Sequence, residues 1–199
     1  MHCFEYGREH SEELNRYCET VHYYKRNTGI SSHFSSLPYT VKSRQSVELE
    51  NHLLNDDYPI LCEVLHTTYL FDDPRFSHRV LIYRHSNIEH EYYRALASSE
   101  TNGIKKYYLL KEAKALEKYE SIVDKCNLIF AVNELDAEYY RKKYIKPKVI
   151  CIPSFHANDS LITKPGKGDY ILYHGNLSVS ENAEAAVWLA ENVFGKIKH

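Results

Sequence analysis

The residues best suited to chemistry lie in one segment, residues 83–91 (YRHSNIEHE), between an apolar run and a helical pattern. In open α/β sheets, ligands bind beyond the carboxyl ends of the strands, so a site is expected in such a loop. His85 could transfer a proton there, or donate a hydrogen bond to a sugar hydroxyl or a phosphate. The alternative is structural: Asn87 caps the helix, Glu89 and Glu91 complement its dipole, and the histidines are solvated.

Loops after other predicted strands could line the same cleft. They are residues 5–8, 66–68 and 133–134. For residues 66–68, a helix start capped by threonine is an equally good interpretation. Taken with the first segment, these loops give a candidate set of ligand-binding residues: Glu5, Tyr6, Gly7, Arg8, His66, Thr67, Asn87, Glu89 and His90.

A second candidate is the turn at residues 174–178 (HGNLS), between a predicted strand at 170–174 and a predicted helix. Glycine lets the backbone approach an anion, and the free N–H groups of a helix start point toward it. Gly175 and Asn176 could therefore bind a phosphate, and Ser178 and Glu181 have the spacing of a capping box. The alternative is a tight turn without a ligand, because neither GxGxxG nor a P-loop is present.

Other chemistries lack their motifs. His85 and His90 are five residues apart and do not share a helical face, so no metal site is predicted. The sequence has no Gly-x-Ser-x-Gly elbow and no CxxC pair, which disfavours hydrolase and redox functions. Its five cysteines are odd in number and lie mostly in apolar runs, which is typical of free thiols in a reducing compartment.

Composition narrows the function further. The 199 residues include 25 Lys and Arg against 27 Asp and Glu, a net charge of −2 that disfavours nucleic-acid binding. No apolar run approaches the roughly 20 residues that span a bilayer, and no signal peptide opens the chain, so we expect a cytoplasmic protein. A basic run at residues 141–148 could contact anionic lipid headgroups at the inner face of the membrane, although a solvated helix end is the simpler interpretation.

The order of elements predicts an α/β fold with a mostly parallel sheet. Short apolar runs indicate strands at residues 2–6, 21–24, 60–65, 80–83, 128–132 and 149–152, and runs such as 60–65 suit strands that are covered on both faces. Helical patterns occupy residues 43–55, 89–125 with a hinge at Asn102-Gly103, and 136–144. This alternation is typical of a doubly wound, Rossmann-like sheet.

The composition changes at residue 154. Residues 154–169 are polar and rich in turn formers, so we predict a first domain at 1–153, a linker at 154–169 and part of a second domain at 170–199. One strand and one helix cannot bury a core of their own. We therefore expect a fragment with exposed apolar surface on its last helix, through which it could dimerise.

Four segments resemble a known family in their order and spacing: residues 84–94 (RHSNIEHEYYR), 133–136 (NELD), 152–155 (IPSF) and 173–177 (YHGNL). Together they are similar to a bacterial group of family 4 glycosyltransferases, whose GT-B architecture pairs two Rossmann-like domains across a cleft. The resemblance covers nearly the whole chain. It implies a GT-B N-terminal domain that lacks its first βα unit, followed by the start of the donor-side domain.

The resemblance also implies a reaction and roles for residues. The reaction would be transfer of a sugar from a UDP- or GDP-linked donor to a glycan or lipid-linked acceptor, usually with retention and without a cofactor or an obligatory metal. His85 would be the cleft histidine near the reacting sugar, and Gly175 and Asn176 would meet the donor diphosphate. A truncated chain of this kind is expected to be nearly inactive alone.

Two other functions stay open. A GT-B nucleotide-sugar 2-epimerase would need carboxylate acid and base residues in the cleft. A non-catalytic sugar-binding or interaction module would bind glycans without a nucleotide, and would fold as a monomer.

Overall fold

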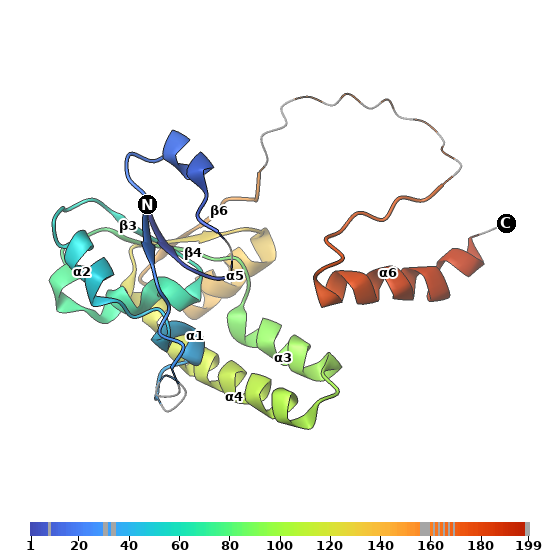
Figure 1. Cartoon of the computed structure of the whole chain (residues 1–199), viewed down its shortest axis with the longest axis horizontal. Helices are drawn as coiled ribbons and strands as arrows, with labels where there is room; N and C mark the ends of the chain where they lie inside the picture. The colour runs from blue at the N-terminus through green and yellow to red at the C-terminus, as the bar shows by residue number, and fades with distance from the viewer. Residues whose placement is uncertain are drawn as a thin grey trace. The chain divides into compact units, whose positions relative to one another are not determined.

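The computed structural model describes residues 1–7, 9–29, 32, 35–155, 160, 162, 164, 166, 168 and 170–197. The chain divides into two compact units, Met1–Phe155 and His156–His199 (Figure 1). The predicted linker, residues 154–169, falls mostly outside the described part of the chain.

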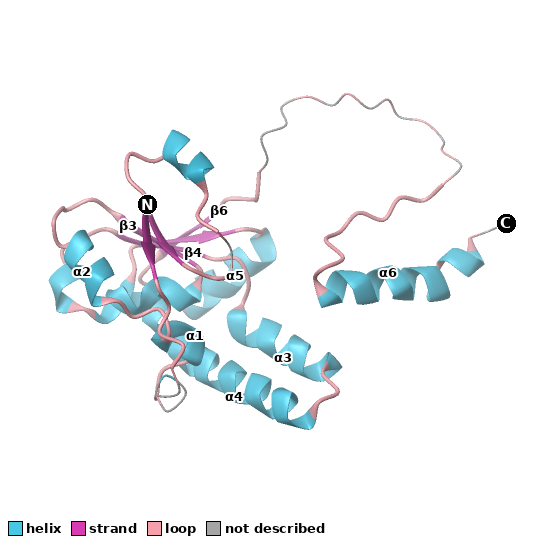
Figure 2. Cartoon of the chain, in the orientation of Figure 1, coloured by secondary structure: helices cyan, strands magenta, loops and turns pink. Residues whose placement is uncertain are grey.

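The first unit contains two parallel sheets. One has four strands in the order β3-β4-β5-β6, and the other pairs β1 with β2. The bounds are β1 His2–Phe4, β2 His22–Tyr24, β3 Ile60–Glu63, β4 Leu81–Arg84, β5 Leu128–Ala131 and β6 Lys148–Cys151. Figure 2 shows these strands at the centre of the unit with helices around them. The prediction of an α/β fold with parallel strands is confirmed.

The connections between the strands are mostly helical, as parallel pairing requires. Between β4 and β5, α3 and α4 lie side by side (Figure 1), with the predicted break at Asn102, whose side chain accepts from the backbone of Ile104 and Lys105. The bounds are η1 Glu12–Arg16, α1 Tyr39–Lys42, α2 Val47–Leu53, η3 Leu65–Asp72, η4 Pro74–Phe76, α3 Glu89–Ser99, α4 Gly103–Tyr119, η5 Glu120–Lys125 and α5 Glu134–Lys143, where η marks a 3-10 helix.

Burial along the strands differs from the sequence prediction at one edge of the four-stranded sheet. Tyr83 on β4 and Ile129 on β5 are fully buried in the core, as expected. On β3, however, Ile60 and Cys62 are buried while Leu61 and Glu63 are exposed. The prediction that this strand is covered on both faces is therefore wrong. In the described ladders β3 pairs only with β4, so it is an edge strand with one solvated face.

A buried carboxylate joins the two helical regions. The position before α1 is Pro38, which has no side-chain oxygen to cap the helix. Glu112 on α4 takes that role: it accepts from the backbone N–H groups of Tyr39 and Thr40, at 3.1 and 2.9 Å, and from the Thr40 hydroxyl at 3.0 Å. Helix α1 is thus held by a residue more than 70 positions away in the sequence.

The second unit contains α6 (Ser180–Asn192) and the 3-10 helix η6 (Phe194–Lys196). The predicted strand at residues 170–174 is not formed; these residues have no strand pairing in the described part of the chain. The predicted capping box is also wrong, because Val179 occupies the N-cap position and makes no side-chain cap bond. Val187 and Trp188 on α6 are more than half exposed, as expected for an apolar face without a core.

Candidate functional site

The candidate site lies where the parallel strands of the first unit end. β3, β4, β5 and β6 run in one direction, so their carboxyl ends meet at one edge of the sheet. β1 and β2 also end together, at residues 4 and 24. The predicted site residues of the first unit all follow such strand ends, and the contacts below show which of them come together.

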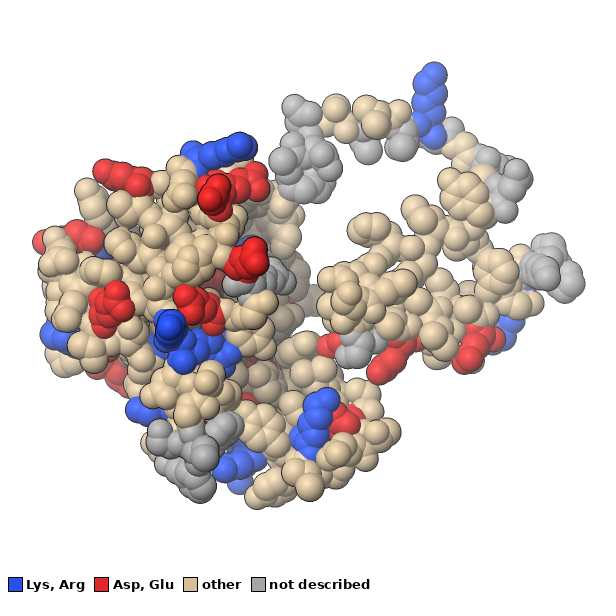
Figure 3. Space-filling model, in the orientation of Figure 1, with Lys and Arg blue, Asp and Glu red and all other residues tan. Residues whose placement is uncertain are grey.

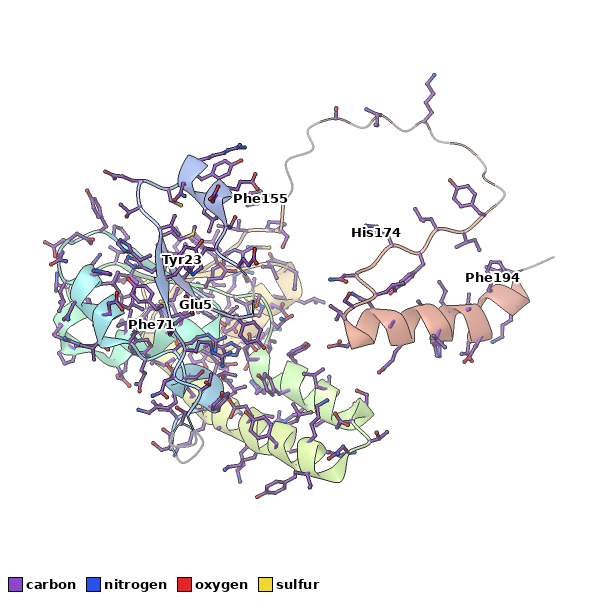
Figure 4. All side chains as sticks on the ribbon, in the orientation of Figure 1. Glu5, Tyr23, Phe71, Phe155, His174 and Phe194 are labelled. Atoms are coloured by element: carbon purple, nitrogen blue, oxygen red, sulfur yellow. The ribbon has the colours of Figure 1, made fainter. Side chains whose placement is uncertain are left out.

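Residues after β1 line an open cavity. Glu5, which is labelled in Figure 4, follows β1 directly, and its backbone N–H donates to Tyr24 O at 2.9 Å. Gly7 has φ +62, a left-handed conformation that L side chains rarely adopt, so glycine is the fitting residue at this turn. The predicted site residue Arg8 lies outside the described residues. The cavity measures about 490 Å³ and is lined by Glu5, Tyr6, Gly7, Lys25, Arg26 and Thr28.

The Tyr6 ring is at the centre of a charged group, which consists of Tyr6, Lys25, Arg26 and Arg44. The Tyr6 side chain is 70% exposed, and its ring centroid lies 4.9 Å from Cζ of Arg26 and 6.0 Å from Cζ of Arg44. Arg44 also interacts electrostatically with Tyr93 and Glu89 at the start of α3. The loop after β1 and the segment after β4, which the sequence analysis placed in one cleft, therefore meet around Arg44.

His66 and Glu89 are brought together, as predicted for loops at one sheet edge. Nε2 of His66, just after β3, is 3.3 Å from Oε2 of Glu89 on α3. The exposed fractions of the two side chains are 14% and 5%. The contact lacks hydrogen-bond geometry, and Nε2 of His66 has no other hydrogen-bond partner among the described residues. Thr67 points elsewhere, because its hydroxyl donates to the backbone oxygens of Glu63 and Val64 at 2.8 and 3.1 Å.

The backbone just before His66 is strained. Val64 has φ +61, the one described non-glycine residue with positive φ. This is an outlier for a β-branched residue, at an expected cost of about 1–3 kcal/mol. Its N–H donates to Arg84 O at 3.0 Å, and its carbonyl accepts from Thr67 N, so the neighbouring strand and turn hold the conformation. Strain of this kind occurs at functional sites, and here it sets the position of His66.

His85 is held inside the unit rather than at its surface. Its side chain is fully buried; Nε2 lies 2.8 Å from Oδ2 of Asp136 and Nδ1 lies 3.2 Å from the Tyr140 hydroxyl. Asn133, the N-cap of α5, donates from Nδ2 to the same Asp136 oxygen at 2.6 Å. Both ring nitrogens of His85 thus face protein partners, and Asp136, 22% exposed, is the part of this cluster that a ligand could reach. Direct contact between His85 and a reacting sugar stays a prediction.

Two other predicted residues of the segment after β4 lie apart from the group around Arg44. His90 is buried, with Nδ1 3.2 Å from Oε2 of the buried Glu120. Asn87 is exposed and does not cap α3, because Ile88 occupies the N-cap position and no side chain caps the helix there. Neighbouring helical positions point in different directions, so Glu89 and His90 reach different surroundings.

The predicted donor site lies in the second unit. Gly175 and Asn176 are both exposed and follow His174, which Figure 4 labels. Oδ1 of Asn176 accepts from Ser178 N at 3.0 Å, and its carbonyl accepts from Asn182 Nδ2 at 3.1 Å. A side chain at Gly175 would come within 3.3 Å of the Tyr173 ring. The turn is therefore organised by its own residues, and phosphate binding there stays a prediction.

Three residues of the charged group were not singled out from the sequence: Lys25, Arg26 and Arg44. The first two directly follow the predicted strand at residues 21–24, so the rule that selected Glu5 and Tyr6 would also have selected them. Arg44 falls in the helix predicted at residues 43–55, whereas the structure places it between α1 and α2, and no local signal marks it as a site residue. Within the described ranges no group of three or more His, Cys, Asp or Glu side chains could hold a metal ion.

Three of the five basic residues at 141–148 pair with carboxylates within the unit: Arg141 with Glu134, Lys142 with Glu138, and Lys143 with Glu120. Lys146 and Lys148 are exposed and have no carboxylate at ion-pair distance among the described residues. Contact of this run with lipid headgroups stays a prediction. Among the described residues, no helix is both long enough and apolar enough to cross a membrane.

Arranged in this way, the first unit can hold a polar ligand at its strand ends. Tyr6 offers an apolar ring face with a hydroxyl, which suits a sugar ring, and the arginines offer several N–H donors. Comparison with known proteins adds no family: no family model matches the sequence, and no significant match occurs among curated proteins or solved structures.

Proposed function

We propose that the chain belongs to a glycosyltransferase of the GT-B type, which transfers a sugar from a UDP- or GDP-linked donor to a glycan or lipid-linked acceptor. In this proposal the first unit is the Rossmann-like, doubly wound acceptor-side domain, and the second unit carries part of the donor side. The similarity of residues 84–94, 133–136, 152–155 and 173–177 to family 4 glycosyltransferases supports it.

One structural observation carries the acceptor side of the proposal. Residues from three separate strand ends, Tyr6 after β1, His66 after β3 and Glu89 after β4, form a continuous group through Arg44. The resemblance to family 4 glycosyltransferases assigns all three residues to the binding of the acceptor. Tyr6 would stack on a sugar ring, while bonds from Glu89 and His66, whose side chains are 5% and 14% exposed, to the sugar hydroxyls stay a prediction.

His85 enters the proposal as a positioning residue. Because its ring bonds to Asp136 and Tyr140, it fixes the start of α5 against the end of β4. Asp136 is then the group nearest the surface that could meet the reacting sugar. Retention of configuration, the absence of an obligatory metal, and peripheral contact with the inner face of the membrane all remain predictions.

The test measures what the chain 1–199 binds and what it converts. We expect carbohydrate acceptors to shift NMR signals of Tyr6, His66 and Glu89, and UDP- or GDP-sugars to shift those of Gly175 and Asn176. Tyr6→Ala should abolish acceptor binding, whereas Tyr17→Ala, which also removes an exposed tyrosine ring, should not. Binding of glycans with no effect of any nucleotide sugar would favour the non-catalytic module instead.

The products separate the enzymatic alternatives. Incubation with a nucleotide sugar and an acceptor should yield a small amount of glycosylated acceptor, read by mass spectrometry. Appearance of an epimerised nucleotide sugar without acceptor would favour the 2-epimerase. If neither glycans nor nucleotide sugars bind, the proposed function is wrong.

A further inference from the structure

Two arginines from different loops converge on one tyrosine ring. Arg26 follows β2 and Arg44 lies between α1 and α2, yet both guanidinium groups lie within about 6 Å of the Tyr6 ring centroid, at 4.9 and 6.0 Å. In Figure 3, Lys and Arg side chains gather over α1 on the face toward the viewer. The fold thus holds two positive charges close together at the carboxyl ends of β1 and β2.

Neither arginine has a carboxylate partner at ion-pair distance within the described part of the chain. Two acidic groups belong to the same region: Glu5 lines the cavity with Arg26 and lies 3.1 Å from His10, and Glu89 interacts electrostatically with Arg44 and lies 3.3 Å from His66. Five other described arginines do pair with Asp or Glu: Arg75, Arg79, Arg84, Arg94 and Arg141. Arg26 and Arg44 thus lack the carboxylate partner that most of the other described arginines have.

The bonds that these arginines do make are to neutral oxygens. Arg26 donates from Nε and Nη2 to the Ser43 hydroxyl, at 3.3 and 2.9 Å, and Arg44 donates from Nη1 to Thr40 O at 2.6 Å. A guanidinium group carries five N–H donors, so these bonds orient both side chains and leave donors over. The positions are therefore fixed while the charge is not neutralised.

This arrangement disfavours the charged form of Arg44. Burial, and then the charge of Arg26, lower the pKa of the Arg44 guanidinium. A bound anion would remove the repulsion between the two charges and would form charge-assisted hydrogen bonds, which are about twice as strong as neutral ones. Arg26 lines an open cavity, and Arg44 lies 6.0 Å from the Tyr6 ring that lines it as well, so both cations are available to an anion from outside.

The cavity beside Tyr6 indicates the size of the ligand. Its volume of about 490 Å³ is within the range of small-molecule sites, roughly 300–1,000 Å³, and exceeds what one phosphate needs. Lys25 and Arg26 line it together with Tyr6. We propose that this site binds a saccharide carrying a phosphate or carboxylate group, with the anion on Arg26 and Arg44 and the sugar ring on Tyr6. That the saccharide is an acceptor rests on the proposed function, whereas anion binding does not.

The experiment titrates the chain 1–199 by NMR with four probes: inorganic phosphate, glucose 1-phosphate, glucuronic acid and glucose. We expect glucose 1-phosphate or glucuronic acid to bind at least tenfold more tightly than glucose. The preferred probe of the two identifies the source of the anion. The double variant Arg26→Gln/Arg44→Gln should lose at least tenfold in affinity for that probe. The double variant Arg16→Gln/Arg94→Gln, which removes the same charge from exposed residues, should lose less than twofold.

A further variant guards against loss of folding. Tyr6→Ala alters an exposed ring and should weaken glucose 1-phosphate more than inorganic phosphate, because only the sugar uses the ring. The inference is overturned if no anionic probe binds the wild type, or if the Arg26/Arg44 variant, folded by circular dichroism, binds as tightly. Binding of the anionic probes without binding of any UDP- or GDP-sugar would overturn the proposed function alone. Transfer to neutral acceptors only, without anion binding, would overturn this inference alone.

Discussion

Glu120 and the pair Arg26 and Arg44 are charged groups of the same unit that the fold treats in opposite ways. Oε1 of Glu120 accepts from the hydroxyls of Tyr139 and Tyr144, at 2.7 and 2.9 Å, and from Nζ of Lys143 at 2.6 Å. Its side chain is 1% exposed. The two arginines, by contrast, are partly exposed and bond only to neutral oxygens among the described residues.

Glu120 forms its bonds within the protein and stabilises the fold, whereas Arg26 and Arg44 keep N–H donors that a ligand can use. A buried carboxylate is tolerated only when several donors surround it, and Glu112 at the start of α1 follows the same rule. A binding site, in contrast, must keep hydrogen-bond donors or acceptors that no group of the protein uses. Removing a charge should therefore weaken folding at Glu120 and weaken binding at Arg26.

The largest expected effect comes from removing Glu120, whose Oε1 accepts three hydrogen bonds while its Oε2, 3.2 Å from Nδ1 of His90, makes none. Glu120→Ala removes the acceptor of the buried Tyr144 hydroxyl, the half-buried Tyr139 hydroxyl and the exposed Lys143 ammonium group, and we expect a loss of about 1–3 kcal/mol in the free energy of unfolding. Urea denaturation followed by circular dichroism measures it. Glu117→Ala, three residues earlier, removes an exposed ion pair with Arg94 and should cost about 0–1 kcal/mol. Equal losses for both variants would show that Glu120 is not supported as described.

The same cluster should respond to alkaline pH. Burial, followed by the charge of Glu120, raises the pKa of Tyr144 above its ordinary value of 10. The folded state therefore retains the phenol proton more strongly than the unfolded state. The contribution of the Tyr144 phenol to the free energy of unfolding is complete below pH 10 and is lost as pH rises above 10.

We expect the free energy of unfolding to fall above pH 10, by up to about 1.4 kcal/mol per pH unit for one phenol. Tyr144→Phe should make that fall shallower, as measured by urea denaturation between pH 9 and 11. Tyr17→Phe, at an exposed position, is the matched control. A Tyr144→Phe slope as steep as that of the wild type would contradict this account.

Some features of the fold and of the site can be predicted from the sequence, and others cannot. Parallel strands and the break at Asn102 follow from local patterns, and the structure confirms both. Of the loops expected at one sheet edge, those that carry His66 and Glu89 are in contact. Burial of His85 could not be predicted, because its partners Asp136 and Tyr140 lie more than 50 residues away. The strand expected at residues 170–174 fails for a related reason: a strand needs a ladder partner, and an apolar run alone does not supply one.

Long-range capping escapes sequence analysis in the same way. The Ser-rich stretch at residues 28–40 predicts a loop with Pro38 near its end. Helix α1 nevertheless begins at Tyr39, because Glu112 supplies the missing acceptor. Arg44 follows α1, so its position beside Tyr6 depends on the contact between Glu112 and the start of α1. No local sequence pattern predicts that contact.

A smaller effect is expected at the turn that carries Tyr6. Gly7→Ala puts a side chain at φ +62, where space is open but the backbone is strained, and should cost about 1 kcal/mol. Gly103→Ala, also in open space but at the start of α4 without positive φ, should instead stabilise the chain by about 0.5 kcal/mol. Thermal unfolding of the two variants should therefore shift in opposite directions. A shift in the same direction would show that Gly7 is not needed for its conformation.

The smallest effect on stability is expected at the arginines themselves. Arg26→Gln removes one of two repelling charges along with bonds to a single hydroxyl, so the free energy of unfolding should change by no more than about 0.5 kcal/mol. In phosphate the two proteins should diverge: a ligand that binds only the folded state raises its stability by RT ln(1 + [L]/Kd). The melting temperature of the wild type should then rise with phosphate concentration and that of Arg26→Gln should rise less, with sodium chloride at equal ionic strength as the control. A large loss of stability in Arg26→Gln without phosphate would place this arginine with Glu120, among the groups that hold the fold.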